Sequence, residues 1–243
     1  MSKTALIIVG QPRTFEFCFP SLKKHILDVY HPDIFICTDD QKERIAELYK
    51  PIALDVLTQE EIFDYAIQLR DAIPSVMPTN DLSVAWKLNR AMTRKAEHEL
   101  VEGFIYDTVI VTRFDVKFRN VPLIKAKQNT FHVPLIGGYW DTPEDTPGIH
   151  WGGYSAHLCW GSSDVMNKIA NIYFDAADYL TLATNATEKF GWAPEHVLKY
   201  FCDVNGIQAF FEDIEMMLIR GTSIHPMSFH NHKLSEYPEY LYD

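Results

Sequence analysis

Short apolar runs alternate with amphipathic segments along the first quarter of the chain. Two runs, 5–9 and 33–38, lack the alternation of a half-exposed strand, and we predict them as buried strands of a parallel sheet. A third strand is predicted at 52–57. Apolar positions recur at the spacing of one helix face in 21–30, and the charged segment 41–49 follows as a second predicted helix. This alternation is typical of the nucleotide-sized half of an α/β sheet.

The rest of the chain continues the alternation and then loses it. We predict helices at 59–70, 81–102, 163–179 and 194–204, and strands at 106–111, 155–160 and within 207–218. Between 134 and 153 glycine, proline, tryptophan and acidic residues dominate without periodicity, and loops of that length are usually functional. No element is predicted in the tail, 221–243. The pattern predicts a single α/β domain with a doubly wound (Rossmann-like), mostly parallel sheet flanked by helices, and irregular loops in the second half.

Composition and charge narrow the class of protein. Of the 243 residues, 47% are apolar and 23% are charged, the balance of an ordinary globular protein. Lys and Arg number 22 against 33 Asp and Glu, and the net charge of −11 disfavours nucleic acid and acidic membranes as partners. No signal peptide or transmembrane segment is predicted, and the four cysteines form no CxxC pair. We therefore expect a cytoplasmic protein.

A loop of Gly10, Gln11, Pro12 and Arg13 follows the first predicted strand. Ligands of open α/β sheets bind outside the carboxyl ends of the strands, where this loop is expected to lie. Arg13 can clamp a phosphate or stack on a base, and the alternative is a turn with a solvated arginine. The loop matches neither GxGxxG nor a P-loop, so it supports neither a dinucleotide fold nor an ATPase.

An arginine and an aspartate leave the strand predicted at 106–111 together. The chain continues with Arg113, Phe114 and Asp115, so the two charged side chains point to one side of an extended backbone. A carboxylate at a strand end can hold a divalent cation that neutralises a diphosphate. The alternative is an Arg–Asp ion pair at the strand end.

Two further segments carry candidate acids and ligands. Glu195 lies in the first turn of the helix predicted at 194–204, where a carboxylate can act as a general base or simply be stabilised by the helix dipole. His225, His230 and His232 gather in the tail, and their spacing matches no zinc motif. One of these histidines as a metal or phosphate ligand, or a surface cluster without a ligand, both fit the pattern.

The long loop combines aromatic and acidic residues. Trp140, Trp151 and Tyr154 lie near Asp141 and several glycines. Exposed aromatic rings beside carboxylates are how many proteins stack on sugar rings and bond their hydroxyls. A packed lid is the competing interpretation, and the two are compatible.

The order of these segments resembles the nucleotide-sugar glycosyltransferases of the GT-A fold. The resemblance rests on GQPRT, DIFICT, SVAWKLNRA, YDTVIVTRFDV, WGSSDVM and APEHVLKYF, and it runs from about residue 4 to 232. The closest types are small enzymes of bacterial capsule and large-DNA-virus glycan assembly, the latter acting in the host cytoplasm. It implies one domain over 1–243, with a nucleotide-sugar half of about 1–118 and an acceptor half and tail of about 119–243.

The resemblance also implies the residues of the donor site and a metal cofactor, Mn²⁺ or Mg²⁺. The nucleotide-sugar site would comprise Gly10, Gln11, Arg13, Thr38, Lys87, Arg90, Arg113 and Asp115. Asp115 would be the metal-binding carboxylate of the DxD region. The sequence departs from that pattern because Arg113 stands at the first DxD position, so Asp115 would need help from His230 or His232. Arg113 would otherwise contact the diphosphate or the sugar directly.

For the chemistry, the resemblance implies hexosyl or pentosyl transfer from a UDP- or GDP-sugar to a glycan hydroxyl. In an inverting reaction Glu195 would take the acceptor proton, with Asp141 as the second candidate. The acceptor would contact Trp140, Trp151, Tyr154 and His196. A sugar nucleotidyltransferase, which would need a better phosphate loop than GQPRT, and a carbohydrate- or nucleotide-binding domain without turnover remain as alternatives.

Overall fold

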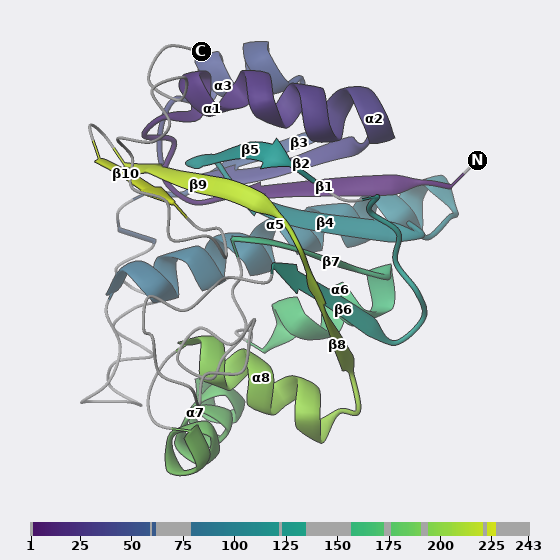
Figure 1. The fold of residues 1–243 in the computed structure, drawn as a ribbon, viewed down its shortest axis with the longest axis vertical. Helices are drawn as coiled ribbons and strands as arrows, with labels where there is room; N and C mark the ends of the chain where they lie inside the picture. Colours follow the sequence, from purple (N-terminus) through teal and green to yellow (C-terminus); the bar gives the residue numbers. More distant parts are fainter. Residues whose placement is uncertain are drawn as a thin grey trace.

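A central β-sheet forms the core of the fold, and the helices pack on it. The computed structural model describes residues 2–58, 60–61, 79–121, 123–134, 157–172, 176–190, 194–220 and 223–226. Within these ranges, seven strands form one sheet in the order β3-β2-β1-β4-β7-β6-β8 (Figure 1). The strands are β1 (Thr4–Val9), β2 (Asp33–Thr38), β3 (Ala53–Val56), β4 (Thr108–Arg113), β6 (Thr130–Pro134), β7 (Leu158–Gly161) and β8 (Gln208–Glu212).

The sheet is mostly parallel, as the apolar runs predict. β1 pairs in parallel with β2 and β4, β2 with β3, and β6 with β8, while β7 runs antiparallel to β4 and β6. In the register, Val9 lies opposite Cys37 on one side and Arg113 on the other. The carboxyl ends of β1, β2 and β4 therefore meet at one edge of the sheet, which we call the carboxyl edge.

Helices cover both faces of the sheet (Figure 1). One face carries α1 (Phe15–Leu22), η1 (Lys23–Leu27), α2 (Asp28–Tyr30) and α3 (Lys42–Tyr49); the other carries α5 (Thr79–Glu102), α6 (Ser163–Asn171), α7 (Ala176–Phe190) and α8 (Pro194–Val204). Alternation along β1 divides its side chains, with Ile7 and Val9 in the α5 core and Leu6 and Ile8 in the α1 core. In the described segments, no helix is both long and apolar enough to cross a bilayer.

A smaller antiparallel sheet ties the carboxyl edge together. It consists of β5 (Val116–Asn120), β9 (Glu215–Arg220) and β10 (Ser223–Pro226) in the order β10-β9-β5. The Ile219 N–H donates to the Asp115 carbonyl oxygen at 2.8 Å, and Thr14 Oγ1 donates to the Ile219 carbonyl at 2.7 Å. Strand β9 thus connects the loop after β1 to the turn after β4.

The first helices differ from the predicted 21–30 segment. The chain becomes helical at Phe15, passes Pro20 inside α1 and continues through the π-helical turn η1. Proline has no N–H to donate to the preceding turn, so a wider turn after Pro20 accommodates the missing hydrogen bond. The single helix predicted over 163–179 is also two helices, α6, which ends at Asn171, and α7, which begins at Ala176.

Three strands that no sequence pattern predicted complete the sheets: β5, β6 and β10, of which β10 lies in the tail where no element was predicted. β5 buries only Val116 and Phe118, and β6 contains Thr130, His132 and Pro134, so neither is a continuous apolar run. The segment predicted at 207–218 forms two strands, β8 and β9. The loop predicted over 134–153 and most of the helix predicted at 59–70 lie outside the described residues.

Candidate active site

The loop after β1 begins the carboxyl edge. Gly10 has φ of 110°, a conformation that glycine adopts without strain, and its carbonyl accepts a hydrogen bond from Thr38 Oγ1 at 3.3 Å. The side chains of Gln11 and Arg13 are exposed. Among the residues that the structure describes, no acid pairs with Arg13. The loop therefore presents an unneutralised guanidinium beside the ends of β1 and β2.

Arg113 and Asp115 form a bidentate ion pair at the end of β4. Arg113 Nε donates to Asp115 Oδ1 at 2.8 Å, and Nη2 donates to Oδ2 at 2.7 Å. The Asp115 side chain is 4% exposed, while that of Arg113 is 23% exposed. A short turn follows Arg113 before β5 begins at Val116, which keeps both side chains on one side of the backbone. The sequence left a cation ligand and an ion pair open, and the structure contains the ion pair.

Lys87 belongs to α5 and is almost completely buried against the face of the sheet that this helix covers. Its Nζ donates to Asp39 Oδ2 at 2.9 Å, and the two side chains are 1% and 6% exposed. Asp39 follows β2 directly, and α5 crosses this face with its amino-terminal half near the carboxyl edge (Figure 1). The pair fixes the turn after Thr38 to α5. A donor contact through Lys87 stays a prediction, and its ammonium would have to share Asp39.

Arg90, the next predicted donor residue on α5, has a carboxylate partner on β3. Its Nε lies 3.3 Å from Asp55 Oδ2, and the side chain is 45% exposed. Arg94 binds the same carboxylate more closely, with Nε at 2.8 Å from Oδ2 and Nη2 at 3.2 Å from Oδ1. Arg94 Nη1 also donates to Glu97 at 2.9 Å, and these acids raise the pKa of its guanidinium. Both arginines therefore bind α5 to the edge strand.

The remaining predicted site residues divide between helix α8 and the undescribed segments. His196 is buried near the start of α8, and Glu195 is the second residue of that helix. The predicted acceptor, base and metal residues that lie outside the described ranges are Trp140, Asp141, Trp151, Tyr154, His230 and His232. The structure therefore brings together Gly10, Thr38 and Arg113 at one edge, and the roles of the others stay predictions.

The metal that the resemblance implies can be tested on Asp115, the one predicted ligand that is described. Both of its carboxylate oxygens accept hydrogen bonds from Arg113. A divalent cation on this carboxylate would lie close to a positive guanidinium and be repelled. Nor do the described ranges contain a group of three or more His, Cys, Asp or Glu side chains that could hold a metal ion. Asp115 as it is paired therefore does not fit a divalent cation.

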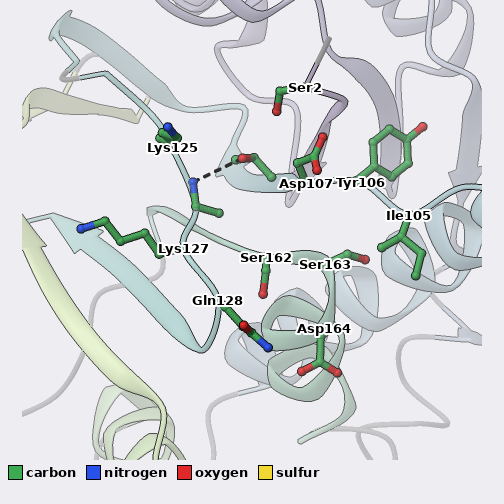
Figure 2. Close-up of a pocket in the computed structure, with 12 residues that line it drawn as sticks. Ser2, Ile105, Tyr106, Asp107, Lys125, Lys127, Gln128, Ser162, Ser163 and Asp164 are labelled. Carbon is green, nitrogen blue, oxygen red and sulfur yellow. Dashed lines mark hydrogen bonds between the residues drawn. The ribbon is translucent and has the colours of Figure 1, made fainter.

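A cavity of about 690 Å³ lies at the opposite, amino edge of the sheet. Figure 2 shows Lys125 and Lys127 on one wall, Asp107 on the other, and the start of α6 with Ser162 and Asp164 below them. The dashed line in that view is the bond from the Ala126 N–H to Thr108 Oγ1, at 3.3 Å. Lysines, carboxylates and hydroxyls are mixed in the lining, so the cavity favours neither sign of charge.

A buried polar cluster lies beneath this cavity, and its residues were not among the predicted site residues. Lys95 Nζ donates to Glu99 Oε2 at 2.9 Å and also to Ser163 Oγ, and Ser163 Oγ donates to Glu99 Oε1 at 2.7 Å. The Tyr106 N–H donates to Glu99 Oε1 at 2.9 Å. Burial lowers the pKa of the Lys95 ammonium, and the Glu99 carboxylate opposes that shift. The spacing of four between Lys95 and Glu99 was the only signal in the sequence.

Comparison with known proteins adds the fold class to this geometry. No protein-family model and no curated protein matches the sequence. Among solved structures, the chain is similar to mouse xyloside xylosyltransferase 1 in its apo form, with a TM-score of 0.50 and 9% identity over 87% of this chain and 85% of that one. The glycosyltransferase GlyE of Streptococcus pneumoniae TIGR4 matches with a TM-score of 0.41 and 10% identity over 88% of this chain and 46% of that one.

The fold class follows from the sheet order and the first of these similarities. The chain is a doubly wound α/β protein with one antiparallel strand among the described strands of a mostly parallel sheet. More particularly, it has the GT-A-like fold of glycosyltransferases. The predicted fold is therefore confirmed.

Proposed function

We propose that this chain is a glycosyltransferase that moves a sugar from a UDP- or GDP-linked donor to a hydroxyl of a glycan acceptor. The observation that supports this most is the carboxyl edge, where a glycine turn, the Thr38–Asp39 turn and the Arg113 guanidinium meet within a glycosyltransferase fold. Nucleotides bind at this edge in open α/β sheets. The nucleotide-sugar half would be about 1–118 and the acceptor half about 119–243.

In the proposed donor site, the nucleoside lies against the turn of Gly10 and Gln11, which buried Thr38 holds from behind, and the diphosphate lies near the cationic side chains. Arg13 is exposed and Arg113 is partly exposed, so both can contact phosphate oxygens as a planar guanidinium does best. Lys87 and Arg90 would contribute behind them, although each already has a carboxylate partner. These contacts would stabilise the negative charge that develops on the leaving group.

The proposed reaction inverts the anomeric configuration. Glu195 takes the proton of the acceptor hydroxyl, and Asp141 is the second candidate for this role. The acceptor oxygen then forms a bond to the anomeric carbon, while the bond from that carbon to the diphosphate oxygen breaks and its electron pair leaves with the nucleoside diphosphate. Trp140, Trp151, Tyr154 and His196 would hold the acceptor glycan.

The test is release of nucleoside diphosphate from a panel of UDP- and GDP-sugars with simple glycan acceptors. In Glu195→Gln we expect kcat to fall by about 10²–10⁴, the usual contribution of a general base. The matched control is Glu188→Gln, which changes an exposed glutamate on the neighbouring helix α7 and should leave kcat unchanged. Nuclear magnetic resonance of the product gives the anomeric configuration.

Three outcomes would contradict parts of the proposal. A retained configuration removes the need for a base and so overturns the role of Glu195. Binding of a nucleotide sugar without any turnover would favour the non-catalytic binding domain. Pyrophosphate release from a nucleoside triphosphate and a sugar phosphate would favour a nucleotidyltransferase.

The buried thiols support the cytoplasmic location that we propose for this enzyme. All four cysteines are free and buried: Cys18, Cys37, Cys159 and Cys202. Burial raises the pKa of Cys18 to about 11 and that of Cys37 to about 12, so both thiols stay protonated at neutral pH. Free, unreactive thiols are the common state in a reducing compartment.

A further inference from the structure

Arg113 and Arg94 bind their carboxylates in the same way but differ in what they have left to donate. Both use Nε and Nη2 for a bidentate pair, Arg113 with Asp115 and Arg94 with Asp55. Arg94 Nη1 then donates to Glu97. Within the described ranges Arg113 has no further acceptor, so three of the five N–H groups of its guanidinium have no partner there. Its partial exposure leaves them within reach of a ligand.

We propose that the Arg113–Asp115 pair takes the place of a divalent cation at the donor diphosphate, so that this chain binds its nucleotide without metal. The inference rests on the proposed function, and it concerns how the leaving group is neutralised. Arg113 would bind the phosphate oxygens through the N–H groups that Asp115 does not use. Asp115 would hold the guanidinium in place.

The Arg113–Asp115 pair has the same net charge as a divalent cation held by two carboxylates. A divalent cation on two carboxylates and a guanidinium on one carboxylate both have zero net charge. The second arrangement also satisfies both oxygens of the buried Asp115. Adding a cation to it would create an excess of two positive charges in a partly buried site, which is costly unless a diphosphate is already present.

The place of Arg113 in the sheet suits this role. It lies opposite Val9 in the register, next to the start of the loop that turns at Gly10 and exposes Arg13. The Ile219 N–H donates a hydrogen bond to the Asp115 carbonyl, and the Ile219 carbonyl accepts one from Thr14 Oγ1. Strand β9 therefore fixes the position of the β1 loop relative to the turn after Arg113. The loop after β1 and the end of β4 therefore each carry a guanidinium group, and planar guanidinium groups bind phosphate oxygens bidentately.

The test measures binding of UDP, GDP, CDP and ADP to the full chain by titration calorimetry, once with EDTA and once with MnCl₂. We expect one of the four to bind with the same Kd in both conditions. A nucleotide that binds only with Mn²⁺ would overturn the inference and leave the proposed function standing. Absence of binding by all four in both conditions would overturn the proposed function and the inference together.

Two variants of Arg113 distinguish a phosphate contact from a merely structural pair. Arg113→Lys keeps the charge but loses the planar fork, and we expect Kd in EDTA to rise about tenfold or more. Arg113→Asp places two carboxylates two positions apart, and we expect it to bind in MnCl₂ but only weakly in EDTA. Arg94→Lys is the matched control, because it alters the other bidentate pair and should leave Kd unchanged.

Stability must be followed beside binding, because both variants change a buried ion pair. Thermal unfolding without nucleotide identifies the temperature at which each variant remains folded, and the titrations are done below it. An unchanged Kd for folded Arg113→Lys in EDTA would overturn the inference. A change in the metal requirement of Arg113→Asp would support it, since a purely structural pair would not alter that requirement.

Discussion

The two edges of the central sheet differ in how completely their charged side chains are hydrogen-bonded to other residues. At the amino edge, Lys95, Glu99 and Ser163 bond one another and satisfy the Tyr106 N–H as well. At the carboxyl edge, Arg113 donates only two of its N–H groups to Asp115 and is partly exposed. The amino edge has the cavity of about 690 Å³, whose lining mixes lysines with carboxylates, whereas the carboxyl edge has the Arg113 and Arg13 guanidinium groups.

This difference shows that a hollow and a binding site need not coincide. The charges beneath the amino-edge cavity are balanced, and its lining mixes Lys125 and Lys127 with Asp107 and Asp164. A closed network of this kind stabilises the contact of α5 with α6, because each buried polar group has its partner. Binding of an anionic leaving group requires donors that the fold has not already used, and Arg113 and Arg13 provide them.

The largest effect is expected from opening the closed network. Lys95→Met leaves the Glu99 carboxylate buried without its ammonium partner, and breaking a buried pair in this way costs about 3–5 kcal/mol. Urea unfolding followed by circular dichroism measures the loss, with Lys125→Met as the exposed-lysine control. Nucleotide Kd should not change while the variant is folded. A decrease of less than about 1 kcal/mol in the free energy of unfolding would show that the cluster contributes little to stability.

A smaller loss of stability, combined with a loss of function, is expected at the carboxyl edge. Asp39→Asn removes the charge that compensates buried Lys87 but leaves a hydrogen-bond acceptor, and we expect about 2–3 kcal/mol of destabilisation. Nucleotide binding should weaken as well, because the turn after Thr38 would shift. Asp40→Asn alters the exposed neighbour and serves as the control. Unfolding and titration of both variants decide whether stability and binding are coupled at this edge.

The smallest change in stability is expected from charge reversal of exposed residues, and it compares the edges directly. Lys125→Glu at the amino-edge cavity and Arg13→Glu at the carboxyl edge should each alter stability by less than about 0.5 kcal/mol. Arg13→Glu should raise nucleotide Kd about tenfold or more, because a phosphate contact becomes a repulsion. Lys125→Glu should leave Kd unchanged. The reverse result would place the nucleotide in the amino-edge cavity and end the comparison.

Most elements of the first half of the fold were predictable because their signals are local. Continuous apolar runs identify β1 and β2, since strands buried on both faces cannot carry alternating polar residues. Strands β5 and β6 were not predictable in this way. His132 of β6 is buried because it stacks between Trp160 and Phe210, at ring-centroid distances of 5.1 and 5.3 Å, and Glu212 binds its Nδ1 at 2.6 Å. Partners so far apart in the chain leave no periodic pattern.

The sequence predicted that Gly10, Thr38 and Arg113 would lie at one edge of the sheet, but not how the charged residues there pair. Parallel strands ending in glycine, Thr38 and Arg113 had to bring these residues to one edge, because the carboxyl ends of adjacent parallel strands lie together. The partner of Lys87 is 48 positions away on another element, and no spacing rule indicates it. The Arg113–Asp115 pair is local, yet the sequence pattern allowed a cation ligand as well as an ion pair, and only the structure shows the ion pair.

By itself, the sequence determined the α/β class, the parallel core and the edge at which the carboxyl ends of the first strands meet. The first two follow from the spacing of apolar residues, which is a local signal in the sequence. The third follows because adjacent parallel strands run in the same direction and so end at the same edge. Only the tertiary structure decided which charges neutralise one another, and hence that Asp115 is occupied by Arg113 while Lys95 belongs to a closed cluster. Electrostatic pairing depends on distance and burial in three dimensions, and residues 68 positions apart, such as Lys95 and Ser163, come into contact only when the chain folds.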